Sequence, residues 1–215
     1  MKKYLWGILY ALFLTAFTVY VLMDTFVIER VYSIVQPEND GGGSESGQGG
    51  ASPILTAVSY ADDNISITIT EYRENGTTIY AADVHLSSPA YLKTALASGA
   101  YGRNVTENTS EIAAENNAIL AINGDYYGSR ENGYVLRNGV LYRSTASDNQ
   151  EDLVIYADGS FEIITETDIS AEQLLADGAQ QILCFGPALV IGGELSVTEE
   201  EEAGKAKTSN PRTAI

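Results

Sequence analysis

The longest apolar run of the chain lies near its N-terminus. Residues 4–23 contain no charged side chain, so twenty helical residues at about 1.5 Å each would span roughly 30 Å, the thickness of a bilayer core. Lys2 and Lys3 precede the run, whereas Asp24 and Glu29 follow it. Because positive charge stays on the cytoplasmic side, the pattern predicts a single-pass anchor with a cytoplasmic N-terminus. A cleaved signal peptide is the alternative, although its apolar stretch is usually only about 7–15 residues long.

Beyond this run, β-rich segments alternate with short turn sequences. Asn-Gly, Asp-Gly and Gly-Gly pairs favour tight hairpin turns, and they occur at positions 75–76, 138–139, 158–159 and 192–193. Three helices are expected between the strands, over residues 89–98, 110–117 and 171–177, from capping residues and a proline in the first turn. Residues 118–122 are apolar and directly follow the second helix, which predicts a central strand.

The combined pattern predicts an α+β fold, with a mixed, largely antiparallel sheet and covering helices, preceded by one N-terminal transmembrane helix. Three segments are expected. Residues 1–30 form the cytoplasmic N-terminus and the anchor, and residues 31–57 form a juxtamembrane segment with a Gly/Ser-rich linker, since residues 41–50 have almost nothing to bury. Residues 58–215 form the globular domain.

Charge and cysteine content narrow the classes of partner. The chain has 12 basic and 29 acidic residues; without Lys2 and Lys3, the part after the anchor carries 10 minus 29, or −19. Phosphate backbones require a basic face, so no nucleic-acid partner is expected. An acidic surface confers solubility or suits a high-salt or calcium-rich exterior. Cys184 is the only cysteine, which excludes an intrachain disulfide and predicts a buried thiol.

The segment Ala121-Ile-Asn-Gly-Asp-Tyr-Tyr-Gly128 places a carboxylate, Asp125, on a polar tip after an apolar run. Taken alone, the tip is also typical of a plain Asx-type turn. Three further segments accompany it, Arg137-Asn-Gly-Val-Leu-Tyr142, Phe185-Gly-Pro-Ala-Leu-Val190 and Asn210-Pro-Arg-Thr-Ala-Ile215.

In their order and spacing, these segments resemble the phosphodiester glycosidase family. The family includes the lysosomal uncovering enzyme, which removes N-acetylglucosamine from a phosphodiester, and bacterial proteins labelled exopolysaccharide-related. The resemblance covers residues 58–215. Since the family's pattern continues into a glycine-rich motif with an acidic residue, we expect the domain to be incomplete at its C-terminus.

The resemblance implies a membrane-anchored, extracytoplasmic hydrolase that cleaves a sugar-1-phosphodiester in cell-envelope or exopolysaccharide metabolism. Its partners would be the glycan or sugar-phosphodiester substrate and, through the N-terminal helix, the membrane. The alternative is a non-catalytic envelope protein with a glycan-binding or structural role. Acidic and arginine residues converging on one cleft would favour the enzyme.

The chemistry assigns roles to the motif residues. A departing phosphate monoester needs little protonation, so the reaction requires cationic donors around the phosphate and one carboxylate near the anomeric carbon. Asp125 is the candidate catalytic carboxylate, as acid/base, nucleophile or metal ligand, and Arg212 is the second candidate catalytic residue. Arg137 is a further candidate for binding the phosphate, because a guanidinium fork matches two oxygens.

The other candidates are substrate-binding residues: Asn123, Gly124, Tyr126, Gly186, Thr213 and His85. His85 shares one face of its strand with Asp83, by the alternation of side chains, and a structural role is the alternative for this histidine. No organic cofactor is expected, and a divalent metal such as calcium is compatible with the carboxylates. The choice between retaining and inverting mechanisms stays open, because a second carboxylate of the pair is not evident.

Overall fold

The fold of the 215-residue chain is that of a computed structural model. The structure describes residues 2–34, 54–56, 58–184, 186–197 and 211–215. The predicted flexible linker at residues 41–50 lies outside the described residues.

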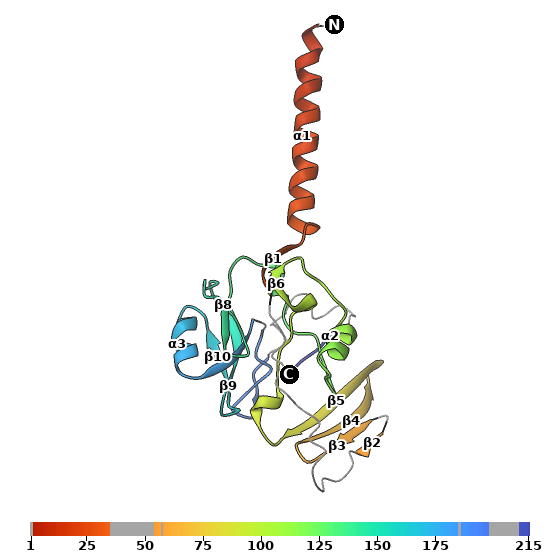
Figure 1. Ribbon diagram of the computed structural model, residues 1–215, viewed down its shortest axis with the longest axis vertical. Coiled ribbons are helices and arrows are strands. Elements are labelled where there is room, and N and C mark those ends of the chain that lie inside the picture. Colours follow the sequence, from red (N-terminus) through yellow and green to blue (C-terminus); the bar gives the residue numbers. More distant parts are fainter. Residues whose placement is uncertain (1, 35–53, 57, 185, 198–210) are drawn as a thin grey trace.

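Helix α1 (Lys2–Phe26) stands apart from the rest of the molecule (Figure 1). Its segment from Trp6 to Phe26 is long and apolar enough to cross a membrane, and no residue of its apolar window is buried within the protein. An exposed apolar surface of this length is typical of a membrane-spanning helix or of a signal sequence. The predicted membrane-length helix is therefore present, while its orientation in a membrane stays a prediction.

A five-stranded antiparallel sheet forms the largest packed unit, with strand order β10-β9-β11-β7-β8. The strands are β7 (Val135–Arg137), β8 (Val140–Arg143), β9 (Glu151–Tyr156), β10 (Phe161–Thr165) and β11 (Ala179–Leu183). Helix α3 (Ala171–Ala176) covers one face, and the buried core between helix and sheet includes Leu136, Val154, Leu174 and Ile182.

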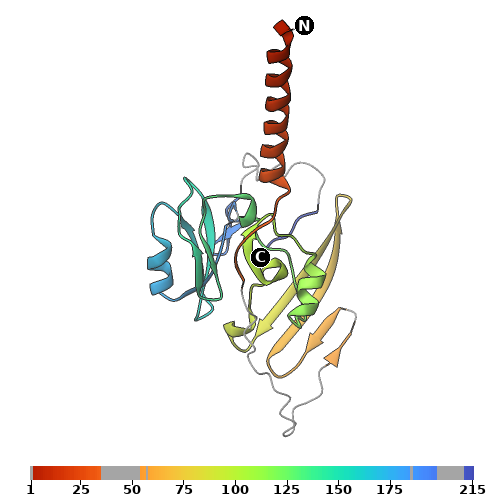
Figure 2. The same cartoon turned by 45° about the horizontal axis from the view of Figure 1, so that its top comes forward.

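A second antiparallel sheet contains β2 (Ile54–Leu55), β3 (Ser59–Ala61), β4 (Ile65–Glu74) and β5 (Thr77–Leu86). Figure 2 shows its long β4–β5 hairpin beside α2 (Thr109–Glu115) and apart from the five-stranded sheet. Two shorter pairs complete the described strands, β1 (Arg30–Ile34) with β6 (Ala100–Arg103) and β12 (Val190–Ile191) with β13 (Glu194–Leu195).

The β1–β6 pair joins the membrane-length helix directly to the globular part. Arg30 pairs with Arg103 and Val31 with Gly102 across the ladder. The side-chain amide of Asn104 donates to the carbonyl oxygens of Thr25 and Ile28, at 3.1 Å each. These bonds satisfy backbone groups at the end of α1. The domain limits stay a prediction, but strand pairing with the globular part begins at Arg30, the last residue of the expected anchor segment, and continues into the expected juxtamembrane segment.

The α+β class is confirmed, and every described strand pairing is antiparallel. Four predicted hairpin turns are present, at the β4–β5, β7–β8, β9–β10 and β12–β13 connections. Asn138 and Gly139 have φ angles of 50° and 76°, the left-handed conformation that a tight hairpin turn requires at both central positions. Helices α2 and α3 begin and end within a few residues of their predicted limits.

Two local predictions are wrong. Instead of a helix over residues 89–98, the chain forms two 3-10 turns, η1 (Pro89–Tyr91) and η2 (Ala97–Gly99), and Ser98 is left-handed with φ 53°. Residues 118–122 form no strand, and Ile119 and Ile122 are 43% and 50% exposed. An apolar run becomes a strand only where a neighbouring strand offers a free edge, and no described strand pairs with this segment.

Candidate active site

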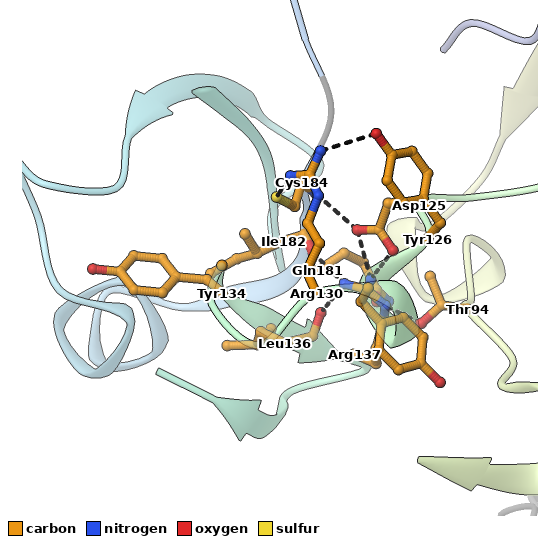
Figure 3. Close-up of polar contacts among 12 residues, drawn as sticks. Thr94, Asp125, Tyr126, Arg130, Tyr134, Leu136, Arg137, Gln181, Ile182 and Cys184 are labelled. Atoms are coloured by element: carbon orange, nitrogen blue, oxygen red, sulfur yellow. Dashed lines mark hydrogen bonds and ion pairs between the residues drawn. The ribbon is translucent and has the colours of Figure 1, made fainter. Parts of the chain in front are cut away.

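The candidate site centres on a buried ion pair between Asp125 and Arg137. Asp125 lies in the irregular segment that precedes η3 (Tyr127–Ser129), and Arg137 is the last residue of β7. Arg137 Nη2 donates to both Asp125 carboxylate oxygens, at 2.7 and 2.8 Å, and the two side chains are only 5% and 3% exposed (Figure 3). The hairpin that holds Arg137 therefore fixes the position of the Asp125 carboxylate.

Neighbouring backbone groups complete this arrangement. The backbone N–H of Cys184 donates to Asp125 Oδ2 at 2.8 Å, and Arg137 Nη1 donates to the carbonyl oxygens of Leu136, at 3.0 Å, and of Ile182. The Tyr127 ring centroid lies 5.7 Å from the Arg137 guanidinium carbon. These contacts offset the cost of removing two charges from water. They also direct Arg137 Nη1 and Nη2 toward protein acceptors rather than toward solvent.

A second contact joins two motifs that are far apart in the sequence. Thr213 Oγ1 and Asn123 Oδ1 lie 2.7 Å apart, with Thr213 donating. This bond brings the Pro-Arg-Thr segment against the loop that contains Asp125. The Arg212 side chain is exposed, and its Nη1 donates to the Pro211 carbonyl at 3.1 Å. Arg212 and Asn123 are therefore solvent-accessible groups of the two segments, whereas Asp125 is buried beneath the surface.

Tyr126 and Arg130 form the adjoining edge of the loop. The Arg130 guanidinium carbon lies 4.8 Å from the Tyr126 ring centroid, and Arg130 Nη2 donates to the Tyr126 hydroxyl at 2.9 Å. Arg130 Nη1 donates to Gln150 Oε1, at 2.8 Å, and to Cys184 Sγ, at 3.2 Å. Tyr126 thus lies on the protein surface, 55% exposed, with the Arg130 guanidinium against its ring.

The remaining candidates lie elsewhere or serve the backbone. His85 is on β5, in the other sheet, with its side chain 76% exposed and its Nε2 atom 3.4 Å from Asp83 Oδ2. The predicted same-face arrangement of these two side chains is therefore present. Among the described residues, none apart from its chain neighbours would lie within 4 Å of a Cβ added at Gly124. Gly186 precedes Pro187 through a cis peptide bond. The roles assigned to these residues stay predictions.

Sequence reasoning missed a cluster of buried polar side chains next to the ion pair. One ligand atom each of Asp152, Glu166 and Cys184 lies within 4.8 Å of the others, and all three residues are buried. Glu166 accepts bonds from the backbone N–H groups of Tyr134, at 2.7 Å, and Ser147, at 2.5 Å. No spacing or motif marks these residues, because their strands and loops meet only in the folded chain.

Protonation follows from this burial. Burial and then the neighbouring Glu166 carboxylate raise the pKa of Asp152 to about 8, and burial raises the pKa of the Cys184 thiol to about 12. Asp152 therefore keeps its proton at neutral pH, and neither of its carboxylate oxygens has a hydrogen-bond partner within the described part of the chain. Two carboxylates and a thiol could also ligate Zn²⁺, whereas a sulfur ligand does not suit Ca²⁺, which prefers oxygen.

Stability should therefore depend on pH through Asp152. Because the folded state holds this proton more tightly than the unfolded state, the stabilising contribution is complete below about pH 4 and is lost as the pH rises through about 8. Its slope is at most about 1.4 kcal/mol per pH unit. Asp152→Asn, which does not ionise, should remove this component of the slope. Urea unfolding between pH 5 and pH 8, with a chelator present, measures it.

The exposed Asp158 provides the matched control: hydrogen bonds from Ser160 lower the pKa of its carboxyl, so Asp158→Asn should leave the slope between pH 5 and pH 8 unchanged. Equal pH slopes for the unmodified chain and Asp152→Asn would show that Asp152 is already ionised in the folded protein.

Comparison with known proteins was consistent with these motifs. Residues 116–215 match the family model described as phosphodiester glycosidase. This segment contains both the Asp125–Arg137 pair and the Asn123–Thr213 bond. No curated protein and no solved structure matches the chain.

Proposed function

We propose, from the phosphodiester glycosidase family match of residues 116–215, that this protein hydrolyses a sugar-1-phosphodiester of the cell envelope or of an exopolysaccharide. The observation that carries the proposal is the hydrogen bond between Asn123 and Thr213, at 2.7 Å. This bond joins two motif segments that are far apart in the sequence. Asn123 lies two residues before Asp125, whose carboxylate is paired with Arg137. A phosphoryl group and a sugar require such a combination of donors and one anion.

In this proposal the exposed residues contact the substrate first. Arg212 binds the phosphate, and Asn123, Thr213 and Tyr126 contact the sugar. Asp125 supplies the carboxylate near the anomeric carbon. Because the phosphate monoester leaves with little protonation, a carboxylate ion-paired to Arg137 fits the reaction without acting as a strong acid. Its near-complete burial requires a small movement of the loop when substrate binds.

The burial of Asp125 is also the observation that favours a second function. The ion pair of Asp125 and Arg137, with side chains 3% and 5% exposed, could have a purely structural role and hold the loop in place. The neighbouring exposed residues could then bind a glycan without cleaving it. Turnover distinguishes the two functions. The full-length protein in detergent micelles should release reducing sugar from a sugar-1-phosphodiester, and binding of the same compound without release would support the glycan-binding function.

The variant Thr213→Val tests whether this site is responsible. It removes the hydroxyl that donates to Asn123 but keeps the size of the side chain, so kcat/KM should fall about 5- to 10-fold, as for loss of one hydrogen bond. Thr78→Val, at an exposed position of β5, is the matched control. Equal activity of both variants would place the reaction elsewhere.

The proposed location is a membrane, with α1 as the anchor and the globular part outside the cytoplasm. The charge difference across the apolar run supports this orientation. A protease added to intact cells should digest the globular part but leave an N-terminal tag protected. Digestion of the tag, with protection of the globular part, would reverse the orientation.

A further inference from the structure

A hollow lies between the strand that follows α1 and the globular part. Its volume is about 270 Å³. Its charged lining residues are four arginines and one glutamate: Arg30, Arg103, Arg130, Arg143 and Glu131. We name this hollow the arginine pocket. It gathers a third of the chain's 12 basic residues in a protein whose net charge is −17.

The charges of the arginine pocket are only partly balanced. Arg30 is paired with Asp24, and Arg103 with Glu131 at 3.1 Å. Arg130 and Arg143 form no ion pair with any described residue. The Arg130 side chain donates to neutral groups. About two positive charges therefore stay uncompensated, which suits an anionic ligand.

Arg143 points most directly to such a ligand. Its Nε donates to the Gly133 carbonyl at 2.6 Å, and its Nη1 donates to the Arg130 carbonyl at 2.7 Å and the Tyr127 carbonyl at 3.2 Å. Its Nη2 is buried and has no hydrogen-bond partner within the described part of the chain. A buried, unpaired guanidinium N–H is costly. An oxygen of a bound anion would satisfy it, and a guanidinium matches phosphate geometry.

The arginine pocket lies at the end of the membrane-length helix. Arg30 comes four residues after Phe26, the last residue of α1, so the two are at most about 14 Å apart along an extended chain. Asn104, next to the lining residue Arg103, bonds to the carbonyls of Thr25 and Ile28. Since each polar layer of a bilayer is about 5–8 Å thick, a membrane-spanning α1 would place the pocket beside the lipid headgroups.

Tyrosine rings form the apolar wall of the pocket. The ring centroids of Tyr32 and Tyr101 are 5.7 Å apart, and those of Tyr101 and Tyr127 are 5.4 Å apart. Tyrosine is enriched at membrane–water interfaces, where one end of the ring is apolar and the other polar. Tyr127 also faces Arg137, the partner of Asp125, so this wall adjoins the candidate active site.

We propose that the arginine pocket binds the phosphate of an anionic membrane phospholipid, attracted by the charges of Arg130 and Arg143 and accepting a hydrogen bond from Arg143 Nη2. The bound lipid holds the globular part at the membrane surface and thereby fixes the distance between the membrane and the neighbouring candidate site. This binding requires α1 to lie in a membrane, but it does not require the proposed hydrolysis.

Lipid retention tests this inference. The full chain is reconstituted in nanodiscs of equal parts phosphatidylglycerol and phosphatidylcholine, released into detergent, and examined by native mass spectrometry. One phosphatidylglycerol should remain bound, with a preference of about tenfold over phosphatidylcholine. Arg143→Gln should abolish that preference, and the double variant Arg30→Gln/Arg103→Gln should reduce it severalfold, because phosphate binding by arginines is electrostatic.

Arg73→Gln is the matched control, because Arg73 is an exposed arginine on the distant β4–β5 hairpin. If Arg143→Gln does not fold, the double variant decides, because the side chains of Arg30 and Arg103 are 41% and 20% exposed. Equal retention by the pocket variants and the control would overturn the inference, because the lipid would then bind α1 nonspecifically. In phosphatidylcholine nanodiscs, tight thermal protection by inorganic phosphate would assign the pocket to a soluble anion and overturn the lipid as ligand.

Discussion

Replacing Arg137 by glutamine should lower the free energy of unfolding of the full chain by about 3–5 kcal/mol, the usual cost of breaking a buried ion pair. The physical reason is the Asp125 carboxylate, which is 3% exposed and would lose both Nη2 bonds. The backbone N–H of Cys184 would then be the remaining described donor to the buried Asp125 carboxylate. Urea unfolding in detergent micelles, followed by the tyrosine signal of the globular part, measures this change.

The exposed pair of Arg73 and Glu71, at 2.7 Å, provides the control. Arg73→Gln should change the free energy of unfolding by less than about 1 kcal/mol, because water screens such pairs. Adding Asp125→Asn to Arg137→Gln should restore part of the lost stability, since no charge is then left unpaired. A loss below about 1 kcal/mol for Arg137→Gln alone would show that water or a rearranged loop replaces the bond.

Replacing Arg212 by alanine should lower kcat/KM on a sugar-1-phosphodiester by about 10²- to 10³-fold, as for removal of one donor to developing charge. The side chain is exposed, so stability should change by no more than about 0.5 kcal/mol. Loss of activity without loss of stability is the combination that separates a substrate contact from a structural role. Initial rates and urea unfolding of the same preparation provide both readings.

Arg73→Ala serves as the matched exposed arginine and should retain full activity. Should Arg212→Ala and Arg73→Ala hydrolyse the substrate equally well, the phosphate is bound by other residues, and the assignment of Arg212 would be withdrawn. Arg212→Lys adds a further distinction, because it keeps the charge but loses the two-oxygen fork and should recover only part of the rate.

Local patterns predicted much of the fold because their causes are local. The Asn-Gly turn at residues 138–139 requires left-handed backbone at both positions, and the structure has φ angles of 50° and 76° there. Ser170 caps α3 by accepting the N–H of Gln173, as its spacing predicted. In contrast, the apolar residues 118–122 form no strand, since strand formation depends on a partner that is remote in sequence.

The candidate site shows the same division. The motifs identified Asp125, Arg137, Asn123 and Thr213 as residues of interest, and the structure joins them in two pairs. The motifs did not reveal which residue would pair with which. Arg137 was expected to bind a phosphate, but its Nη1 and Nη2 donate to protein acceptors. The substrate-binding role of Arg137 therefore remains a prediction.

The amino-acid sequence by itself determined the membrane-length helix, the hairpin turns, the acidic net charge and the family motifs, because each depends on neighbouring residues or on composition. Only the tertiary structure decided which side chains from different elements contact one another and which of them are buried. It buried Asp152 beside Glu166 and Cys184, and it gathered Arg30, Arg103, Arg130 and Arg143 around one pocket. Burial and electrostatic potential depend on distances between residues that the chain brings together only on folding.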